Sequence, residues 1–385
     1  MMDIGGEGEP RRQEGWAGTN DSFVCPACRA ALTRMAEAYQ CASCGRAFPI
    51  LFGIPDFRLR PDRYLSLEEE RAKAGRLHAF AQHASFDALV RYYYEITGDV
   101  PPELAVRYRG YILGGPRRAG PILDALRPCR ETDTLVDLGC GSGGLLVAAA
   151  GRYRAVYGVD IALRWLVICR KHLEEKGIEA TLVCADVEAL PFPDGMASHA
   201  VAADLVEHVY SIASTAEAIQ RLLQPGGKLW LCAANRYCIG PHASTRIWGI
   251  SLLPRRARSW LLRRLKGIDL LRNSNLVSPA GLARLLRARG FAVEVMQPRQ
   301  IAPGTTVGNT AGERFLLALY RKALRLRPLR SALLLVGPAF ELLCRTQTSL
   351  PAGPTPAAAA SSPVVRGSAP AGPRITQRGM PCVSD

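Results

Sequence analysis

The sequence predicts an α/β fold in which a parallel sheet is covered by helices on both faces, with a small metal-binding module before it. Three observations predict this architecture. Short apolar runs alternate with amphipathic helical patterns from Thr134 to Ala233. The first run ends in a glycine-rich turn, Gly139–Gly144, of a kind that lets a ligand approach the backbone. Two Cys-x2-Cys pairs lie near the N-terminus, at Cys25–Cys28 and Cys41–Cys44.

The composition is that of an ordinary soluble protein. Hydrophobic residues make up 48% and charged residues 22% of the 385 positions, which excludes a mainly disordered, collagen-like or coiled-coil chain. At about 150 residues per domain, the length suffices for two to three domains. No apolar run is long enough to cross a bilayer, and the N-terminus lacks the apolar core of a signal peptide. We therefore expect a cytoplasmic protein.

The net charge of +15 is unevenly distributed along the chain. Residues 241–385 contain 22 Lys and Arg but 5 Asp and Glu, a net charge of +17, whereas the first 240 residues carry a net charge of −2. A basic C-terminal half favours contact with nucleic acid, anionic lipid or an acidic substrate. A solvated basic surface without a partner is the alternative.

The two N-terminal cysteine pairs, Cys25 with Cys28 and Cys41 with Cys44, predict a zinc site, because each x2 spacing lets both sulfurs of a pair bind one ion. Four thiolates fill a tetrahedral Zn²⁺ shell and leave no position for water, so we expect a structural zinc ion. The other eight cysteines are scattered, as small hydrophobic residues in a reducing compartment would be. They are Cys129, Cys140, Cys169, Cys184, Cys232, Cys238, Cys344 and Cys382.

Seven apolar or β-branched runs predict the strands of the sheet. They cover residues 134–138, 155–160, 180–185, 197–203, 228–233, 291–296 and 339–345. Because the carboxyl ends of parallel strands meet at one edge, acids in or after the first four runs should lie near one another. These acids are Asp137, Asp160, Asp186 and Asp204.

From Val136 to Gly227 the sequence resembles the Rossmann-like (class I) S-adenosylmethionine-dependent methyltransferases. Val136–Gly143 is similar to the family's first motif, E/D-x-G-x-G-x-G, Asp204–Val209 to the motif after strand four, and Leu222–Gly227 to the L-x-P-G-G turn before strand five. The resemblance implies a seven-stranded Rossmann-like methyltransferase sheet with helical inserts and S-adenosylmethionine as the cofactor. It implies cofactor contacts from Asp137, Gly139, Cys140, Gly141, Gly143, Asp160, Ile161, Asp186, Val187 and Asp204.

Within this resemblance, Asp160 matches the acid that binds the ribose, and Asp186 with Val187 matches the pair that contacts adenine. The methionine part of the cofactor bears an ammonium and a sulfonium, which an anion at Asp137 suits. The same turn also satisfies the weak GxGxxG pattern of nicotinamide dinucleotide sites. The carboxylate just before the turn disfavours a pyrophosphate there, so an NAD-dependent oxidoreductase is the second alternative function.

Glu207 and His208, just after strand four, are the candidate catalytic residues. Transfer from a sulfonium is an in-line displacement that depends mainly on positioning, and it needs a base only when the acceptor must lose a proton. His208 could remove that proton and Glu207 could orient a hydroxyl, although a structural role for both is equally consistent. The strand-four end lacks the Asn/Asp-Pro-Pro motif and a Pro-Cys nucleophile, which disfavours adenine-N6 and cytosine-C5 methylation.

The segment Phe48–Pro55 resembles the zinc-ribbon domains related to the tRNA-methyltransferase activator protein, with Phe48 where those domains usually carry Tyr. The resemblance covers about residues 23–57. A module of this type can bind RNA or extend a neighbouring domain.

These features divide the chain into a disordered N-terminus (1–20), a zinc-ribbon domain (21–58), a helical linker or cap (59–125), a methyltransferase domain (126–348) and a disordered tail (349–385). Two basic helical inserts, about 235–277 and 305–336, interrupt the catalytic domain, and the second is expected to be helical from about Ala311 to Leu335. We expect the inserts first to pack on the domain, second to contact a membrane surface, and third to contact RNA.

The favoured function is S-adenosylmethionine-dependent O- or C-methylation of a small-molecule or lipid-like acceptor. The alternative is an rRNA methyltransferase of the guanine-N1 type whose zinc ribbon assists RNA binding, because a ribbon before this catalytic fold resembles those enzymes. A zinc-anchored binding module with a degenerate cofactor site is disfavoured by the intact glycines and acids. If the inserts bind lipid, the cytoplasmic protein is peripheral at the inner face of the membrane. The sequence leaves the acceptor atom and the oligomeric state open.

Overall fold

The computed structural model describes residues 22–97, 100, 102–242, 245, 247–267, 269, 271–301 and 310–347. The segments 1–20 and 349–385, which the sequence predicts to be disordered, lie outside these residues, as do Cys382 and part of the second basic insert. Within the described ranges, no helix combines the length and the apolar character needed to cross a bilayer.

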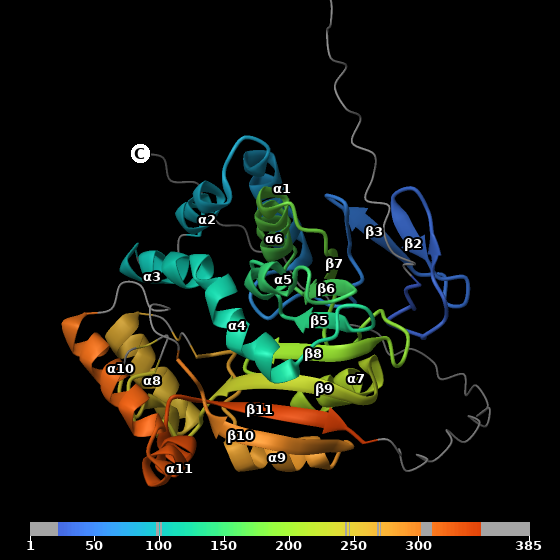
Figure 1. The fold of residues 1–385 in the computed structure, drawn as a ribbon. Coiled ribbons are helices and arrows are strands. Elements are labelled where there is room, and N and C mark those ends of the chain that lie inside the picture. The colour runs from blue at the N-terminus through green and yellow to red at the C-terminus, as the bar shows by residue number, and fades with distance from the viewer. Residues whose placement is uncertain are drawn as a thin grey trace, which may run out of the picture. The chain divides into compact units, whose positions relative to one another are not determined.

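A seven-stranded mixed sheet forms the centre of the protein (Figure 1). Its strand order is β10-β11-β9-β8-β5-β6-β7, and all seven predicted strands are present. The strands β5 to β9 pair in parallel, whereas β11 is antiparallel to both β9 and β10. The predicted α/β class is confirmed. The strands are β5 (Thr134–Leu138), β6 (Ala155–Asp160), β7 (Thr181–Cys184), β8 (Ala197–Ala203), β9 (Leu223–Ala234), β10 (Phe291–Pro298) and β11 (Ala339–Thr346).

One strand starts earlier than the sequence predicts. β9 begins at Leu223, which pairs with Ala197, and the register against β8 then shifts before Lys228 pairs with His199. The expected Pro-Gly-Gly turn lies inside this irregular stretch, where Gly226 has a φ of +77°. The turn is therefore an irregularity within the strand and not a loop that precedes it.

Helices cover both faces of the sheet. On one face, α1 and α2 pack with α6, and on the other, α7 and α9 contribute apolar side chains to the core. The helices α4 and α5 pack together over β5 and β9. These helices are α1 (Leu67–Ala81), α2 (Phe86–Glu95), α3 (Pro102–Leu113), α4 (Gly115–Leu126), α5 (Gly144–Ala149), α6 (Leu163–Lys176), α7 (Ile212–Leu222) and α9 (Pro279–Arg287).

Local sequence signals explain where several helices begin. Ser66 and Glu69 form a capping box at the start of α1, in which each side chain accepts a hydrogen bond from the other residue's backbone. Ser278 caps α9, and Pro279 occupies the first helical turn, as the sequence predicts.

The N-terminal module is a small antiparallel sheet whose aromatic residues share one core with the large sheet. Phe23 lies within 5.0–5.8 Å, between ring centroids, of Tyr39, Phe57 and Phe192. Phe192 belongs to the large domain, so the module is packed onto that domain. Its strands are β1 (Thr33–Arg34), β2 (Ala38–Gln40), β3 (Ala47–Leu51) and β4 (Ile54–Pro55).

The basic inserts contribute a short 3-10 turn, η1 (Ile250–Leu252), and the helices α8 (Arg255–Lys266), α10 (Ala311–Leu324) and α11 (Arg327–Val336). The segment expected to be helical from about Ala311 to Leu335 is helical, but it forms two helices. A break precedes α11 because Pro328 has no N–H to continue a helix and is tolerated only in a first turn. The expectation that the inserts pack on the domain holds for α11: none of its residues is fully buried, but Leu334 packs against the core of the large sheet.

Candidate functional site

The glycine-rich turn after β5 lines the candidate site. Gly139, Gly141 and Gly143 have φ values of +76°, +51° and +79°, in the region that glycine adopts without strain. A Cβ at Gly143 would lie 2.5 Å from the Sγ of Cys169, whereas a Cβ at Gly141 would meet no atom within 4 Å. The turn is therefore tightly packed on the protein side and open at Gly141.

Asp160, at the end of β6, holds this turn. Its Oδ2 accepts a hydrogen bond from the N–H of Gly141 at 2.9 Å, and its Oδ1 accepts one from the N–H of Ala162 at 2.9 Å. Burial raises the pKa of Asp160, and these two N–H groups offset only part of that rise. The carboxylate lies beside the open Gly141, where it can also accept hydrogen bonds from ribose hydroxyls.

Asp137 is a buried acid next to the same turn. Asp137 is 5% exposed. Burial, and to a lesser extent repulsion from Asp160, raise the pKa of Asp137 to about 8. Within the part of the chain that the structure describes, no cationic side chain pairs with it. A buried carboxylate without a cation is unfavourable, so this position fits a ligand that brings a positive charge.

Asp186, after β7, is already bonded within the protein. Its Oδ2 accepts a hydrogen bond from Nε of Arg60 at 2.5 Å, and its Oδ1 accepts one from the N–H of Glu188 at 2.9 Å. Asp186 therefore stabilises its own turn. Arg60 was not predicted from the sequence, because it lies 126 residues from Asp186 in a segment without a recognisable motif.

Asp204, after β8, lies in a second charged cluster. Its backbone is left-handed, with a φ of +53°. The Oδ1 atom of Asp204 pairs with Nη1 of Arg299 at 2.7 Å, and its Oδ2 accepts a hydrogen bond from the Tyr111 hydroxyl at 3.1 Å. Burial would raise the pKa of Asp204, but the charge of Arg299 and these hydrogen bonds outweigh it and lower the pKa. The sequence analysis missed Tyr111 and Arg299, since neither belongs to a motif.

The two candidate catalytic residues lie close to Asp204 but differ in their surroundings. Glu207 is buried, its Oε1 accepts a hydrogen bond from the Ala234 N–H at 2.5 Å, and its Oε2 has no hydrogen-bond partner among the described residues. Burial, followed by repulsion from Asp204, raises the pKa of Glu207 to about 8. His208 is exposed, and its Nδ1 lies 2.8 Å from the Tyr64 hydroxyl.

The four N-terminal cysteines meet as the sequence predicts. The Sγ atoms of Cys25, Cys28, Cys41 and Cys44 all lie within 4.8 Å of one another, and those of Cys28 and Cys41, from different pairs, are 3.4 Å apart. Hydrogen bonding from the backbone of Arg46 lowers the pKa of Cys44 to about 6, which favours its thiolate, whereas burial raises the pKa of Cys25 to about 11. The four sulfurs therefore fit a tetrahedral Zn²⁺ site.

The parallel sheet, the glycine turn and the acids at the strand ends define a Rossmann-like nucleotide-binding domain of the methyltransferase type. Residues 136–231 match the protein family described as a methyltransferase domain. This match covers the glycine turn and the strands from β5 to most of β9. The chain therefore contains a methyltransferase domain.

Two curated relatives are similar to this chain. The ubiquinone biosynthesis O-methyltransferase of Thiobacillus denitrificans is 29% identical over 198 residues, which cover 49% of this chain and 78% of the relative. The enzyme of the same name from Pseudomonas paraeruginosa is 34% identical over 105 residues, which cover 27% of this chain and 45% of the relative. Together with the domain match, these relatives confirm the prediction of an S-adenosylmethionine-dependent methyltransferase.

Solved structures with a similar fold have low sequence identity to this chain. The complex between the Haloferax volcanii Trm112 methyltransferase activator and the putative methyltransferase matches with 18% identity and a TM-score of 0.43, covering 68% of this chain and 97% of that chain. The geranyl diphosphate C-methyltransferase from Streptomyces coelicolor A3(2) matches with 19% identity and a TM-score of 0.40, covering 60% of this chain and 75% of that chain.

Proposed function

We propose that this protein transfers the methyl group of S-adenosylmethionine to an oxygen or carbon atom of a small, lipid-like acceptor. The observation that carries the proposal is the buried, unpaired carboxylate of Asp137 beside the open glycine turn, inside the matched methyltransferase domain. The names of the two relatives support an O-methyl transfer to a hydrophobic acceptor.

We assign the cofactor to one continuous set of residues at the carboxyl edge of the sheet. Asp137 meets the cationic methionine part, Asp160 and Ile161 border the ribose, and Val187 contacts the adenine. The bound cofactor supplies a methyl group on a sulfonium, which leaves as a neutral thioether. The full set is Asp137, Gly139, Cys140, Gly141, Gly143, Asp160, Ile161, Asp186, Val187 and Asp204.

We assign the acceptor to the region of Asp204, Glu207 and His208. Although His208 is exposed, partial loss of hydration around its ring lowers its pKa, and nearby Asp204 opposes this only in part, so its imidazole is neutral at pH 7 and can accept a proton. If its Nδ1–H donates to the Tyr64 hydroxyl, Nε2 carries the free lone pair. Glu207 is mostly protonated at pH 7 because its pKa is about 8, so it can orient an acceptor oxygen but is a poor base.

We also propose that the basic C-terminal helices bring the protein to an anionic membrane surface. Large apolar side chains of α8, α10 and α11 are exposed: Trp260 is 68% exposed, Phe315 69% and Leu335 64%. Figure 1 draws these three helices at the same end of the molecule. Where exposed apolar side chains form a contiguous patch, the patch normally marks a contact with another apolar phase.

The charges around these side chains favour lipid headgroups as the partner. Four arginines of α8 surround Trp260 and Ser259 along a shallow surface hollow, and neither α8 nor α11 contains an acid. Apolar side chains flanked by cations are typical of helices that lie in the interface of an anionic bilayer. The arginines of α8 are Arg255, Arg256, Arg263 and Arg264.

The acceptor is tested by incubating the full chain with methyl-labelled S-adenosylmethionine and cell extract. We expect label in the lipid or small-metabolite fraction. Label in rRNA would instead support the guanine-N1 alternative. Thermal stabilisation by NADH but not by S-adenosylhomocysteine would overturn the cofactor assignment.

Membrane contact is tested by sedimentation with phosphatidylglycerol vesicles and with phosphatidylcholine vesicles. We expect binding to the anionic vesicles alone, weakened by Leu319→Ser and unchanged by Met35→Ser, since these side chains are similarly exposed (54% and 51%) but only Leu319 lies on α10. Equal binding of both variants, or binding to RNA in place of vesicles, would overturn the membrane proposal.

A further inference from the structure

The segment Arg58–Ser66, here called the strap, leads from the zinc ribbon to α1 and crosses the ends of three strands of the large sheet. Its arginines contact residues that follow β6, β7 and β8. The contacts are Arg58 Nη1 to the Ile161 carbonyl oxygen at 3.2 Å, Arg60 Nε to Asp186 Oδ2 at 2.5 Å, and Arg63 Nη1 to the Val209 carbonyl oxygen at 2.9 Å. These are the strand ends that border the candidate cofactor site.

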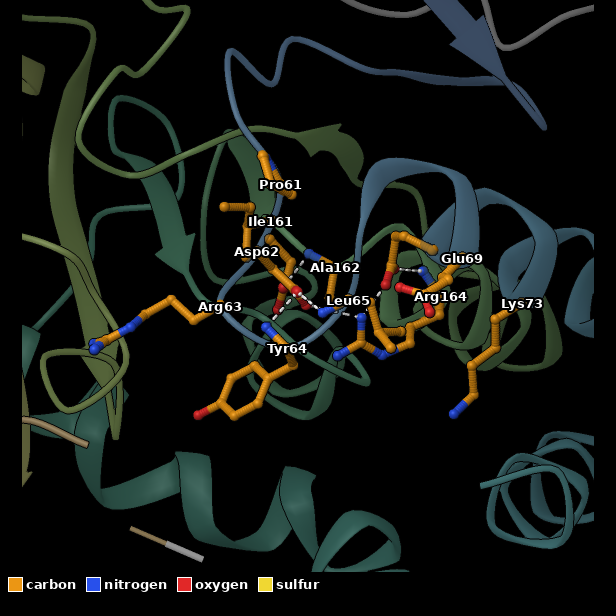
Figure 2. A network of polar contacts seen from close by, with 12 residues as sticks. Pro61, Asp62, Arg63, Tyr64, Leu65, Glu69, Lys73, Ile161, Ala162 and Arg164 are labelled. Carbon is orange, nitrogen blue, oxygen red and sulfur yellow. Dashed lines mark hydrogen bonds and ion pairs between the residues drawn. The ribbon is translucent and has the colours of Figure 1, made fainter. Parts of the chain in front are cut away.

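The strap is anchored by buried groups just before it and at its middle. Before it, Asp56 forms a parallel bridge to Cys184 of β7, and the N–H of Phe57 donates to the Cys184 carbonyl oxygen at 2.8 Å. At its middle, Oδ2 of Asp62 pairs with Nη1 of Arg164 at 3.0 Å, and the two side chains are 3% and 9% exposed. Figure 2 shows this second anchor, with Asp62 directed toward Arg164.

Arg60 is the strap residue beside the proposed adenine contact. Besides its bond to Asp186, its Nη2 pairs with Oε2 of Glu188 at 2.9 Å, and its guanidinium carbon lies 4.1 Å from the centroid of the Tyr210 ring. These three contacts fix the plane of the guanidinium group. Asp186 and Glu188 flank Val187 in the chain, so Arg60 holds the two residues on either side of the backbone group that meets the ligand.

We propose that Arg60 is a positioning residue for the adenine end of the cofactor site, and that the zinc ribbon supplies it through the strap. This inference rests on the proposed function, because it takes S-adenosylmethionine as the ligand. The side chains of Asp186 and Glu188 are 7% and 9% exposed. Without Arg60, two adjacent buried carboxylates would lose their cation, and the turn that presents Val187 would shift to hydrate them.

The first test compares two arginines that are similarly exposed and lie at similar distances from their carboxylates, although the carboxylate is buried for Arg60 and 69% exposed for Arg152. Arg152 pairs with Asp124 at 2.6 Å and its side chain is 37% exposed, whereas Arg60 pairs with Asp186 at 2.5 Å and its side chain is 38% exposed. Arg152 lies in the loop before β6, at the amino edge of the sheet and away from the candidate cofactor site. Calorimetry on the zinc-loaded full chain measures the Kd of S-adenosylhomocysteine. We expect Arg60→Ala to raise this Kd about tenfold, Arg60→Lys to raise it less, and Arg152→Ala to leave it unchanged.

A second ligand shows which end of the site has changed. The compound 5′-methylthioadenosine keeps the adenine and ribose but lacks the amino acid part. Arg60→Ala is expected to weaken this ligand by the same factor as S-adenosylhomocysteine, whereas Asp137→Asn should weaken only S-adenosylhomocysteine. Unchanged affinity for 5′-methylthioadenosine in folded Arg60→Ala would overturn the assignment. If the wild-type protein binds neither ligand, the proposed function fails. If Arg60→Ala does not fold, as judged by circular dichroism, Arg60→Lys and Arg60→Gln provide the comparison.

The third test asks whether the ribbon acts through Arg60. Zinc is removed from the full chain with a chelator and then restored, with metal content measured at each step. We expect zinc removal to raise the Kd of 5′-methylthioadenosine in the wild-type protein but to have little further effect in Arg60→Ala, because both changes release the same group. An unchanged Kd in the zinc-free wild-type protein, or effects that add fully, would overturn the part of the proposal that concerns the ribbon.

Discussion

The carboxyl edge of the sheet and the basic C-terminal helices are both rich in charge but differ in how that charge is satisfied. At the sheet edge, Asp160, Asp186 and Asp204 accept hydrogen bonds or ion pairs from the protein, whereas Asp137 accepts neither from the described residues. On α8, α10 and α11, arginines stand beside exposed apolar side chains such as Trp260. The first region is therefore complete except for one positive charge, which a small ligand can supply. The second needs an extended surface that is both apolar and anionic.

The largest effect is expected from filling the tightest point of the cofactor region. In Gly143→Ala, the new Cβ would meet the Sγ of Cys169 at 2.5 Å, and the left-handed backbone would be strained. We expect loss of S-adenosylhomocysteine binding, measured by calorimetry. Gly151→Ala is the matched control, since Gly151 has a similar φ of +73° and open space around it. Equal loss of binding in both variants would show that backbone strain, and not the local packing, is responsible.

A smaller effect is expected on the acceptor side of the same edge. We expect His208→Ala to lower kcat by about a hundredfold while the Kd of S-adenosylhomocysteine stays the same, because a lost base affects the chemical step alone. Since the pKa of His208 lies below its usual value, the wild-type rate should fall only in acid, as the imidazole becomes protonated. Tyr64→Phe should lower kcat less, as it removes only the partner of Nδ1. Unchanged turnover in His208→Ala would remove this residue from the mechanism.

The unpaired charge of Asp137 predicts opposite effects on binding and on stability. We expect Asp137→Asn to raise the Kd of S-adenosylhomocysteine about tenfold, and we expect the wild-type affinity to increase as the pH rises toward 8, where Asp137 ionises. The folded protein holds this proton more tightly than the unfolded chain, so the contribution of Asp137 to stability is present below about pH 4 and is lost as the pH rises to about 8.

Removing this acid should therefore stabilise the protein at neutral pH. Thermal unfolding of the wild type and Asp137→Asn between pH 4 and pH 8 measures the effect, and the two curves should diverge as the pH increases. Leu135→Ile, in the same strand but fully buried, controls for a general change in the core. Parallel curves would mean that the folded protein already neutralises Asp137.

Much of the cofactor region was predictable because its signals are local. The glycine turn and the acids of β5 to β8 occur within short motifs, and strand pairing brings them to one edge. Arg60 and Arg299 were not predictable, because no motif distinguishes them from other arginines. Arg60 is 126 residues from Asp186 in the sequence, and Arg299 is 95 residues from Asp204. Pro328 is a local signal for the break before α11, which the apolar periodicity on both sides does not show. Which apolar residues of α11 pack against the core, as Leu334 does, depends on tertiary packing, which periodicity does not specify.

The smallest effect is expected on the stability of the basic C-terminal helices. Trp260 is 68% exposed, so Trp260→Ser should change the free energy of unfolding by less than about 0.5 kcal/mol. Phe340, fully buried in β11, provides the contrast, and Phe340→Ala should cost about 3–5 kcal/mol. Urea denaturation of the full chain measures both values. A large cost for Trp260→Ser would mean that this side chain is already covered within the protein, and the need for an external apolar surface would disappear. If Trp260→Ser hardly changes the free energy of unfolding but weakens binding to anionic vesicles, Trp260 contributes to membrane binding and not to stability.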